Sequence, residues 1–266
     1  MRYVFDNDLH IHSTLSSCSS DPAESTERIL AYGVANHLKT LCLTDHFWDD
    51  AVPGASGWYA PQNLAHIRAA LPLPQADGTR FLFGCETELD RNCTLGISPE
   101  HYDLFDFIVI PTTHLHMNGF TCRGDESSAE RAKLWVDRFD AVLGMDLPFH
   151  KVGIAHLTCE LMSPGKFEEV LSLIPDAEME RLFAKAAEKG VGIELNFYSK
   201  RLTADSDIKY DPDTVLRPYR VAKKQGCKFY FASDAHHPAD LDAEKENAER
   251  IIDMLELDES DKFKIK

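Results

Sequence analysis

The sequence has no paired cysteines and no long apolar run. Its seven cysteines include no CxxC pair, which argues against a zinc ribbon and against a disulfide framework. None of its apolar runs approaches the roughly 18 residues that a membrane-spanning helix needs. No basic start followed by an apolar stretch and a small-residue cleavage site marks a signal peptide. These absences predict a reduced, soluble, cytoplasmic protein with no membrane partner.

Positive charge is also scarce. The 266 residues include 28 lysines and arginines against 44 aspartates and glutamates, and the formal net charge at pH 7 is -16. Such a chain repels nucleic acid and anionic membrane surfaces, so neither is expected as a partner. A small anionic substrate stays compatible with this charge, because bound cations reverse the local sign.

No low-complexity linker, fixed-period repeat or compositional break divides the chain. Instead, short apolar runs alternate with amphipathic stretches, which predicts parallel strands with helices outside them. About seven such units in one uninterrupted chain favour a single α/β barrel domain that spans residues 1–266. A doubly wound open sheet is the alternative.

The predicted strands are short and the predicted helices are longer. The strands are expected at Tyr3–Leu9, Thr40–Thr44, Arg80–Cys85, Phe107–Pro111, Val152–Ala155, Val191–Leu195 and Lys228–Ala232. The helices are expected at Glu24–His37, Pro61–Leu71, Ser127–Leu143, Ala177–Lys189, Pro212–Gln225 and Ala239–Leu255, with a short one at Glu168–Leu173. Asp21 is expected to cap the first helix, and Gly190 and Gly226 to end two others.

Histidines and acids follow the predicted strands at their C-terminal ends. They are, in chain order, Asp8, His10 and His12; Asp45 and His46; Glu86 and Glu88; His114 and His116; His156; Glu194 and Asn196; Asp234 and His236. Residues two apart in an extended chain point to one side, so His10 and His12 form a same-face pair, and Asp8 behind them is expected to orient an imidazole. Because the C-terminal strand ends of a parallel barrel meet on one face, we expect these groups to lie together.

Imidazoles and carboxylates gathered in one place are the ligand set of a metal site. His10 and His12 offer nitrogen, while Glu86 and Asp234 offer oxygen. Glu88 has the same strand parity as Glu86 and is the alternative to it. One HxH alone is a weak signal, because buried histidines are common in cores, but its recurrence at several strand ends favours two or three divalent ions.

The segments DLHIHS, LTDHF, GCETEL, TTH, AHL, ELN and SDAHH run in this order from residue 8 to residue 236. The series resembles the PHP (polymerase and histidinol phosphatase) family, and specifically its stand-alone phosphoesterases of histidinol-phosphatase type. This resemblance implies a distorted (β/α)7, TIM-like barrel with a trinuclear metal cluster at the C-terminal ends of its strands.

The resemblance also implies a set of metal ligands. One metal would use His10, His12, Glu86 and Asp234, a second would share Glu86 and add His114 and His156, and a third would use His46 and His236. The chain departs from the family pattern at Cys18, where many members have a further histidine. A thiolate binds zinc well, so Cys18 either completes the third site or is an inert loop residue. Mixed nitrogen and oxygen ligands suit Zn, Mn or Fe alike.

Some loop residues are candidates for contact with a substrate. Lys200, Arg201 and Arg123 are basic residues of an acidic chain and are candidates for binding phosphate, with solvated surface positions as the alternative. The long loop after His46 contains Trp58 and Tyr59. It is expected either to cover the site or to pack on its rim.

The leading hypothesis is metal-assisted hydrolysis of a small phosphate monoester by a hydroxide that bridges two metals. The candidate catalytic residues are Asp234, His236 and His116, and either histidine is a candidate to protonate the leaving alkoxide. The resemblance suggests histidinol phosphate as the small phosphorylated metabolite and phosphate as a product. A phosphodiesterase or nucleotidase acting on nucleotides or oligonucleotide ends is the first alternative, and an inactive metal-binding structural domain is the second. The sequence leaves the oligomeric state open.

Overall fold

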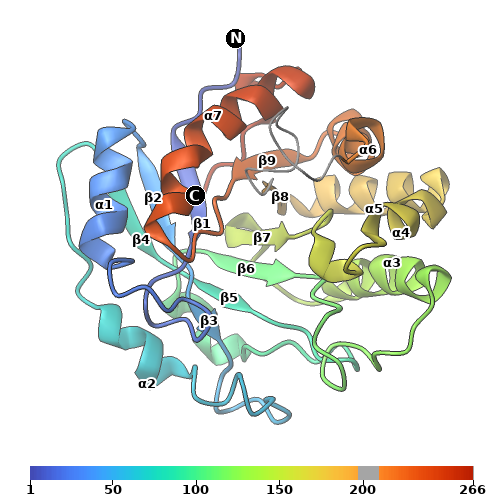
Figure 1. Cartoon of the computed structure of the whole chain (residues 1–266), viewed down its shortest axis with the longest axis horizontal. Helices are drawn as coiled ribbons and strands as arrows, with labels where there is room; N and C mark the ends of the chain where they lie inside the picture. The colour runs from blue at the N-terminus through green and yellow to red at the C-terminus, as the bar shows by residue number, and fades with distance from the viewer. Residues whose placement is uncertain (197–209, 266) are drawn as a thin grey trace.

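Parallel strands occupy the middle of the molecule, and helices lie around them (Figure 1). The computed structural model describes residues 1–196 and 210–265. The strands are β1 Asn7–Ile11, β2 Thr40–Leu43, β3 His46–Phe47, β4 Arg80–Phe83, β5 Cys85–Thr87, β6 Ile108–Pro111, β7 Val152–Ala155, β8 Gly192–Leu195 and β9 Lys228–Phe231. The helices are α1 Thr26–Ala35, α2 Leu64–Ile67, α3 Ser128–Gly144, α4 Phe167–Leu173, α5 Asp176–Lys189, α6 Pro212–Lys224 and α7 Pro238–Met254. Short 3-10 turns lie at Arg68–Ala70, Pro99–Leu104, Phe149–Lys151, Glu160–Met162 and Glu259–Asp261.

Two of the barrel strands are each broken into two pieces. β2 continues into β3 after a kink at residues 44–45, and β4 continues into β5 after Gly84. The pieces belong to different sheets, because β1, β2 and β4 form one sheet while β3, β5, β6, β7, β8 and β9 form the other. When each broken strand is counted once, seven strands of the described chain run around the barrel. This arrangement confirms the distorted (β/α)7 architecture and excludes the open sheet.

Gly84 makes the second kink possible. A Cβ atom at this position would lie 2.5 Å from the carbonyl oxygen of Phe107 and 2.7 Å from Sγ of Cys42. Both distances are far below van der Waals contact, and the Phe107 oxygen belongs to a backbone that has little freedom to move. The amide of Gly84 donates to the Leu43 carbonyl at 2.7 Å, whereas the next amide donates to Phe107 at 3.1 Å. The chain therefore changes sheets at this glycine, two residues before Glu86.

The barrel closes between β9 and β1 through a short backbone contact. The amide of Asp234 donates to the carbonyl oxygen of His10 at 2.8 Å, and the amide of His12 donates to that of Ala235 at 3.0 Å. These bonds lie just beyond the C-terminal end of β9. They hold two candidate ligands on β1 against a third candidate ligand that follows the last strand.

Side chains of β1 also bond to the backbone at the end of β9. Oδ1 of Asn7 accepts a hydrogen bond from the amide of Phe231 at 3.2 Å. Oδ1 of Asp8 accepts one from the amide of Ser233 at 3.0 Å, and its Oδ2 accepts one from the hydroxyl of Tyr32 at 3.3 Å. The expectation that Asp8 orients an imidazole is therefore wrong, because its carboxylate faces the seam between the first and last strands.

Aromatic rings fill the barrel near the N-terminal ends of the strands. Phe107, Tyr230 and Phe263 contact one another there with ring centroids 5.1 to 6.2 Å apart. Phe263 belongs to the segment that follows α7, and its amide donates to the carbonyl of Phe229 at 2.8 Å. These rings are buried, and the hydroxyl of Tyr230 donates to Oε2 of Glu194 at 3.3 Å. The histidines and acids of the strand ends lie towards the C-terminal end of the barrel.

Most of the predicted elements are confirmed to within a few residues. Gly190 and Gly226 have positive φ angles and follow α5 and α6, as predicted. The first strand lies later than predicted, and Tyr3 is buried ahead of it. The first helix is capped by Ser25, four residues after the expected Asp21. None of the described helices has the length and apolar content needed to cross a bilayer.

Replacement of Gly84 with alanine is expected to destabilise the protein by about 1–3 kcal/mol, because the added methyl group overlaps the Phe107 carbonyl. Gly144→Ala is the matched control, since a Cβ at the exposed end of α3 meets nothing within 4 Å. The free energy of unfolding of this control is expected to stay within about 1 kcal/mol of the parent value. Urea unfolding followed by circular dichroism measures both, and equal stability of the two variants would contradict the role given to Gly84.

Candidate metal centre

A first cluster joins the histidine pair on β1 to two acids from other strand ends. Nε2 of His10 and Nε2 of His12 are 3.0 Å apart, which confirms that the pair faces one side. Oε2 of Glu86, on β5, lies 3.5 and 3.4 Å from these nitrogens. Oδ1 of Asp234, after β9, lies 3.5 and 3.2 Å from them. These four residues are called the first cluster.

The spacing within the first cluster matches a coordination shell. Ligand atoms around a tetrahedral ion are about 3.4 Å apart when each lies about 2.1 Å from the ion. Lone pairs and negative charges repel one another at this spacing unless positive charge lies among them. The donor set of two nitrogens and two oxygens therefore fits a divalent ion.

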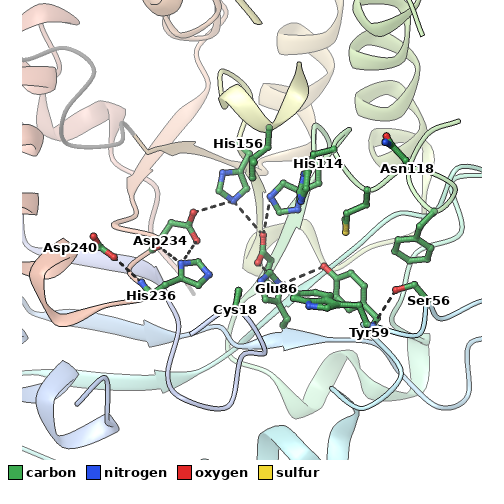
Figure 2. A pocket seen from close by; sticks show the side chains of 16 residues that line it. Cys18, Ser56, Tyr59, Glu86, His114, Asn118, His156, Asp234, His236 and Asp240 are labelled. Atoms are coloured by element: carbon green, nitrogen blue, oxygen red, sulfur yellow. Dashed lines mark hydrogen bonds and ion pairs between the residues drawn. The ribbon is translucent and has the colours of Figure 1, made fainter. Parts of the chain in front are cut away.

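The other oxygens of the two acids face a second pair of imidazoles. Nε2 of His156, after β7, is 3.4 Å from Oε1 of Glu86 and 3.7 Å from Oδ2 of Asp234. Nε2 of His114, after β6, is 3.9 Å from Oε1 of Glu86. Figure 2 shows both imidazoles beside the Glu86 carboxylate, with Asp234 next to His156. These four residues form the second cluster, so each carboxylate lies between two clusters.

The surroundings of the Glu86 carboxylate indicate that cations fit this arrangement. Its side chain is fully buried, and neither carboxylate oxygen has a hydrogen-bond partner of acceptable geometry. A buried carboxylate in that state costs several kcal/mol unless positive charge compensates it. Imidazoles surround both oxygens, as described above. One divalent ion at each oxygen fits these donors.

Both shared acids stay ionised despite their burial. Burial opposes ionisation of Glu86, but the neighbouring His46 and His10 outweigh it and hold its pKa well below the usual value. Burial of Asp234 is outweighed in the same way by His156 and then His10, so its pKa is also lowered. The two clusters therefore contain two negative charges that attract cations.

The imidazoles divide into two groups by their pKa values. Burial opposes protonation of His10 and His156, yet the acids around them raise the pKa of both well above the ordinary value. The leading acids are Glu194 for His10 and Asp234 for His156. Burial, followed by the charge on His156, lowers the pKa of His114 to about 3. Protons on some of the rings thus balance the buried carboxylates of the metal-free protein.

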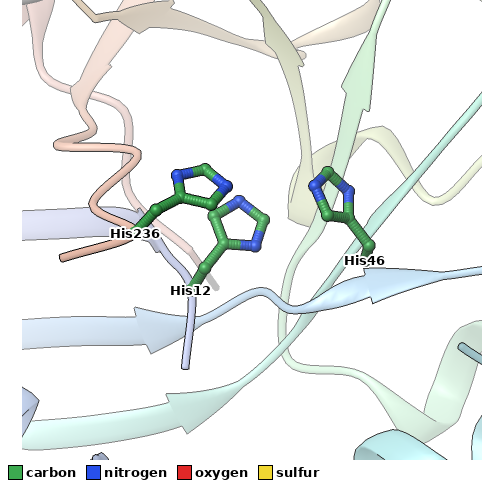
Figure 3. A group of neighbouring side chains, drawn as sticks. All are labelled: His12, His46 and His236. Carbon is green, nitrogen blue, oxygen red and sulfur yellow. The ribbon is translucent and has the colours of Figure 1, made fainter. Parts of the chain in front are cut away.

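A third cluster consists of His12, His46 and His236 (Figure 3). The His12 ring lies 4.2 Å from that of His236 and 4.5 Å from that of His46, measured between centroids. Nδ1 of His46 is also 2.8 Å from Oε2 of Glu86. Burial lowers the pKa of His46, but Glu86 and then Cys18 raise it to about 9. The exposed Cys18 thus lies close to the third cluster and lines the same pocket.

The backbone is strained at two of the candidate ligands. His156 has a φ of 63° and Asp234 a φ of 52°, in the left-handed region that residues other than glycine rarely adopt. Such conformations cost on the order of 1–3 kcal/mol each and concentrate at functional sites. The hydroxyl of Thr113 donates to the carbonyl of His156 and holds one of these turns. These turns direct the His156 imidazole towards Glu86 and Asp234, and the Asp234 carboxylate towards the imidazoles of both clusters.

Hydrogen bonds fix the outer nitrogens of the β1 pair. Nδ1 of His10 lies 2.6 Å from Oε2 of Glu194, and Nδ1 of His12 lies 2.8 Å from Oγ of Ser16. A carboxylate accepts, so Nδ1 of His10 carries a proton, and the neutral ring that binds a metal would present the lone pair of Nε2 to the first cluster. Glu194 was recognised in the sequence as a strand-end acid without a role. It has one here as an acceptor behind the first cluster.

Glu88 occupies the same kind of position behind the second cluster. Its Oε2 lies 2.9 Å from Nδ1 of His114, and its Oε1 accepts from Nη2 of Arg138 at 3.1 Å. Both oxygens are therefore directed away from the shared faces of the clusters. The alternative in which Glu88 replaces Glu86 as a ligand is wrong, because this pairing turns Glu88 towards α3.

The clusters lie at the wall of a pocket of about 710 Å³. Its apolar lining consists of Trp58, Tyr59, Met117, Phe120 and Leu161. Trp58 and Tyr59 come from the long loop after β3, so this loop forms part of the pocket lining. The polar lining residues outside the clusters are Ser56, His116, Asn118 and Asp240, together with Cys18. Figure 2 shows Ser56 and Asn118 on the side opposite to His236 and Asp240.

Of the three predicted phosphate-binding residues, the structure describes only Arg123, and this residue does not line the pocket. The side chain of Arg123 is 60% exposed, and it pairs with Asp125 at 3.0 Å and with Glu130 at 2.8 Å. These acids hold it on the surface, so its assignment to the phosphate site is wrong. Lys200 and Arg201 lie outside the described residues.

Of two further pocket residues, the sequence indicated His116 as a candidate but not Asp240. His116 lines the pocket as predicted, with its ring 5.4 Å from that of His114, and burial lowers its pKa to about 4. Sequence analysis missed Asp240, whose Oδ2 accepts from the amide of His236 at 3.2 Å. The available signal was Pro238, a typical first residue of a helix, which places residue 240 on the first turn beside the strand ends.

The fold of the chain is similar to that of several solved structures, whereas its sequence has no close match. No protein-family model and no curated protein matches the sequence. The fold is similar to that of histidinol phosphate phosphatase from Lactococcus lactis, solved with zinc, L-histidinol and phosphate, with a TM-score of 0.57 and 16% identity over 95% of this chain and 94% of that chain. It is also similar to a protein from Listeria monocytogenes assigned as a histidinol phosphatase, with a TM-score of 0.61 and 10% identity over 88% and 96%. The fold is therefore of the histidinol-phosphatase type that the sequence resemblance implied.

Glu86→Gln is expected to remove at least two bound ions per chain, because its oxygens face two clusters. His236→Ala, which alters the third cluster alone, is expected to remove at most one. Asp240→Asn lies in the same pocket but outside the clusters, so it should retain the parent metal content. Elemental analysis of zinc-loaded proteins after gel filtration measures all three, and a full metal content in Glu86→Gln would contradict the shared role of this carboxylate.

Proposed function

We propose that this protein is a metal-dependent hydrolase of small phosphate monoesters, of the histidinol-phosphatase type. The observation that carries the proposal is the buried carboxylate of Glu86, which has no hydrogen bond and lies among imidazoles from four strand ends beside a pocket. The fold similarity to a phosphatase solved with zinc and phosphate supports the same reading.

The proposed ligands follow the geometry of the clusters. His10, His12, Glu86 and Asp234 would hold one ion, Glu86, Asp234, His114 and His156 a second, and His46 and His236 with Cys18 a third. When bound, divalent ions lower the pKa of water towards neutrality and neutralise the charge of a phosphate. Zn, Mn and Fe all suit this mixture of nitrogen and oxygen donors.

The pocket would position a substrate of metabolite size. A volume of about 710 Å³ is in the range of small-molecule sites. The clusters would take the phosphate group, and the apolar wall with Trp58 and Phe120 would take the organic group. Among the lining residues that the structure describes there is no lysine or arginine. Within the described lining, the cations and imidazoles would therefore bind the phosphate, and the candidates Lys200 and Arg201 lie outside the described residues.

His116 is proposed to carry a proton during the reaction. Hydrolysis moves one proton from the attacking water to the oxygen of the leaving alcohol. His236 is less suited to this role, because its Nδ1 is bonded to the Asp234 carbonyl at 2.7 Å and its ring belongs to the third cluster. The ring of His116 lines the pocket, and one of its nitrogens accepts a proton while the other releases one. Asp234 is proposed to act as a shared ligand rather than as an acid.

Activity is tested on the protein as purified and reloaded with zinc or manganese. We expect release of phosphate from histidinol phosphate and from p-nitrophenyl phosphate, and loss of activity after chelation. Greater activity on a bis-aryl diester than on the monoesters would favour the phosphodiesterase reading. Fully occupied clusters without activity on any of these substrates would favour a structural metal-binding domain.

His116→Ala is expected to lower kcat about 100-fold for an alkyl monoester such as histidinol phosphate. The effect on p-nitrophenyl phosphate should be less than about tenfold, because a nitrophenolate leaves without a proton. Steady-state kinetics on the two substrates provide the comparison, and each serves as the control for the other. An equal loss on both would assign His116 to binding or structure instead.

A further inference from the structure

Arg138 is a buried cation in the middle of α3, outside the pocket. Its side chain is 2% exposed. All five of its N–H donors are used: Nε bonds to the Thr112 carbonyl, Nη1 to the carbonyls of Asp90 and Thr121, and Nη2 to the Leu89 carbonyl and to Oε1 of Glu88, at 2.8 to 3.3 Å. The planar fork of an arginine provides this number of directed donors, and a lysine does not.

These bonds join two loops that lead to the second cluster. Leu89 and Asp90 follow β5, which holds Glu86, whereas Thr112 and Thr121 flank the segment that contains His114. The Thr121 hydroxyl also donates to the carbonyl of His114. Arg138 therefore holds the two loops at a fixed separation from behind the cluster.

Glu88 connects Arg138 to the imidazole itself. Its Oε1 accepts from Arg138 and from the amide of Leu89 at 2.8 Å, and its Oε2 lies 2.9 Å from Nδ1 of His114. Arg138 favours the ionised form of Glu88 against its burial. The ionised carboxylate accepts from Nδ1 of His114, so the ring then carries its proton there. The lone pair is then on Nε2, which faces Oε1 of Glu86.

Stability alone does not account for this buried ion pair. Buried ion pairs of this kind are often matched or exceeded in stability by apolar residues of similar volume. The pair instead fixes a tautomer and the position of two loops, and both are requirements of metal ligation rather than of folding.

We propose that Arg138 and Glu88 are positioning residues, which hold His114 with its Nε2 lone pair directed at the second cluster and thereby set the affinity of that cluster for metal. The inference rests on the proposed metal centre but not on phosphatase activity. Neither residue lines the pocket. Their effect on a substrate would therefore be exerted through His114.

Glu88→Gln is the sharpest test, because the two groups have the same shape. A glutamine amide has one acceptor oxygen, whereas the carboxylate has two. If this oxygen accepts from Arg138, the NH2 group donates to Nδ1 of His114, and the proton of the ring then lies on Nε2. We expect a 10–100-fold weaker affinity for the Zn²⁺ of the second cluster, with binding at the first cluster retained. Titration of the metal-free protein with Zn²⁺ measures the affinities, and ¹⁵N NMR of the histidine rings reports the tautomer of His114.

Glu126→Gln is the matched control. Glu126 is a poorly exposed acid between β6 and α3, and it accepts from the amides of Arg123 and Gly124 without contact to an imidazole. It is expected to leave both the zinc affinities and the tautomer of His114 unchanged. Arg138→Lys is the second variant should Glu88→Gln fold poorly, and it is expected to weaken the same site.

Retention of the parent zinc affinity and of the Nδ1-protonated tautomer in Glu88→Gln would overturn the proposal. Zinc affinity and tautomer are measured without a substrate. A parent protein that binds zinc but hydrolyses no phosphate ester would therefore contradict the proposed function while leaving the positioning role intact.

Discussion

The whole site depends on one constraint, the burial of the Glu86 carboxylate without a hydrogen-bond partner. A charge in that position is tolerated only where positive charge surrounds it. The fold provides this by ending separate strands around it, so that imidazoles from β1, β3, β6 and β7 all approach its two oxygens. The same arrangement makes Glu86 the residue through which the clusters interact, because a change in charge at one cluster alters the potential at the next.

The distortions of the barrel follow from that constraint. A regular strand presents alternate residues to one side, and β1 does so with His10 and His12. The alternation of side chains along a strand does not by itself bring the other candidate ligands to the site. Gly84 lets the chain change sheets just before Glu86, and left-handed backbone at His156 and Asp234 turns these side chains inwards. Each departure lowers local stability, and packing elsewhere in the barrel compensates for it.

Much of this arrangement was predictable, and what was missed has physical causes. Strand–helix alternation predicted the barrel, and the recurrence of His, Asp and Glu at strand ends predicted which residues meet. The hydrogen bond between Nδ1 of His114 and Glu88 was not predictable from the sequence. Glu88 and Glu86 have the same strand parity, and only the ion pair of Glu88 with Arg138, on a distant helix, distinguishes their roles. Arg123 was misassigned for a similar reason, since the surface acids that hold it lie in the next helical turn and its loop. The role of Asp8 was predicted wrongly because its carboxylate bonds across the closure of the barrel, and the pattern of strand residues does not indicate such side-chain hydrogen bonds.

The charge balance of the pocket has a consequence for how a phosphate would enter it. The chain carries a net charge of -16, and the pocket lining includes Glu86, Asp234 and Asp240 but, among the described residues, no lysine or arginine. A dianionic substrate would be repelled by such a surface in the metal-free protein. Cations at the clusters reverse the local sign, so occupancy by metal and affinity for phosphate must rise and fall together. A pocket lined by arginines would bind phosphate without metal, whereas here the acids that would recruit the cations would also repel a phosphate until those cations are bound.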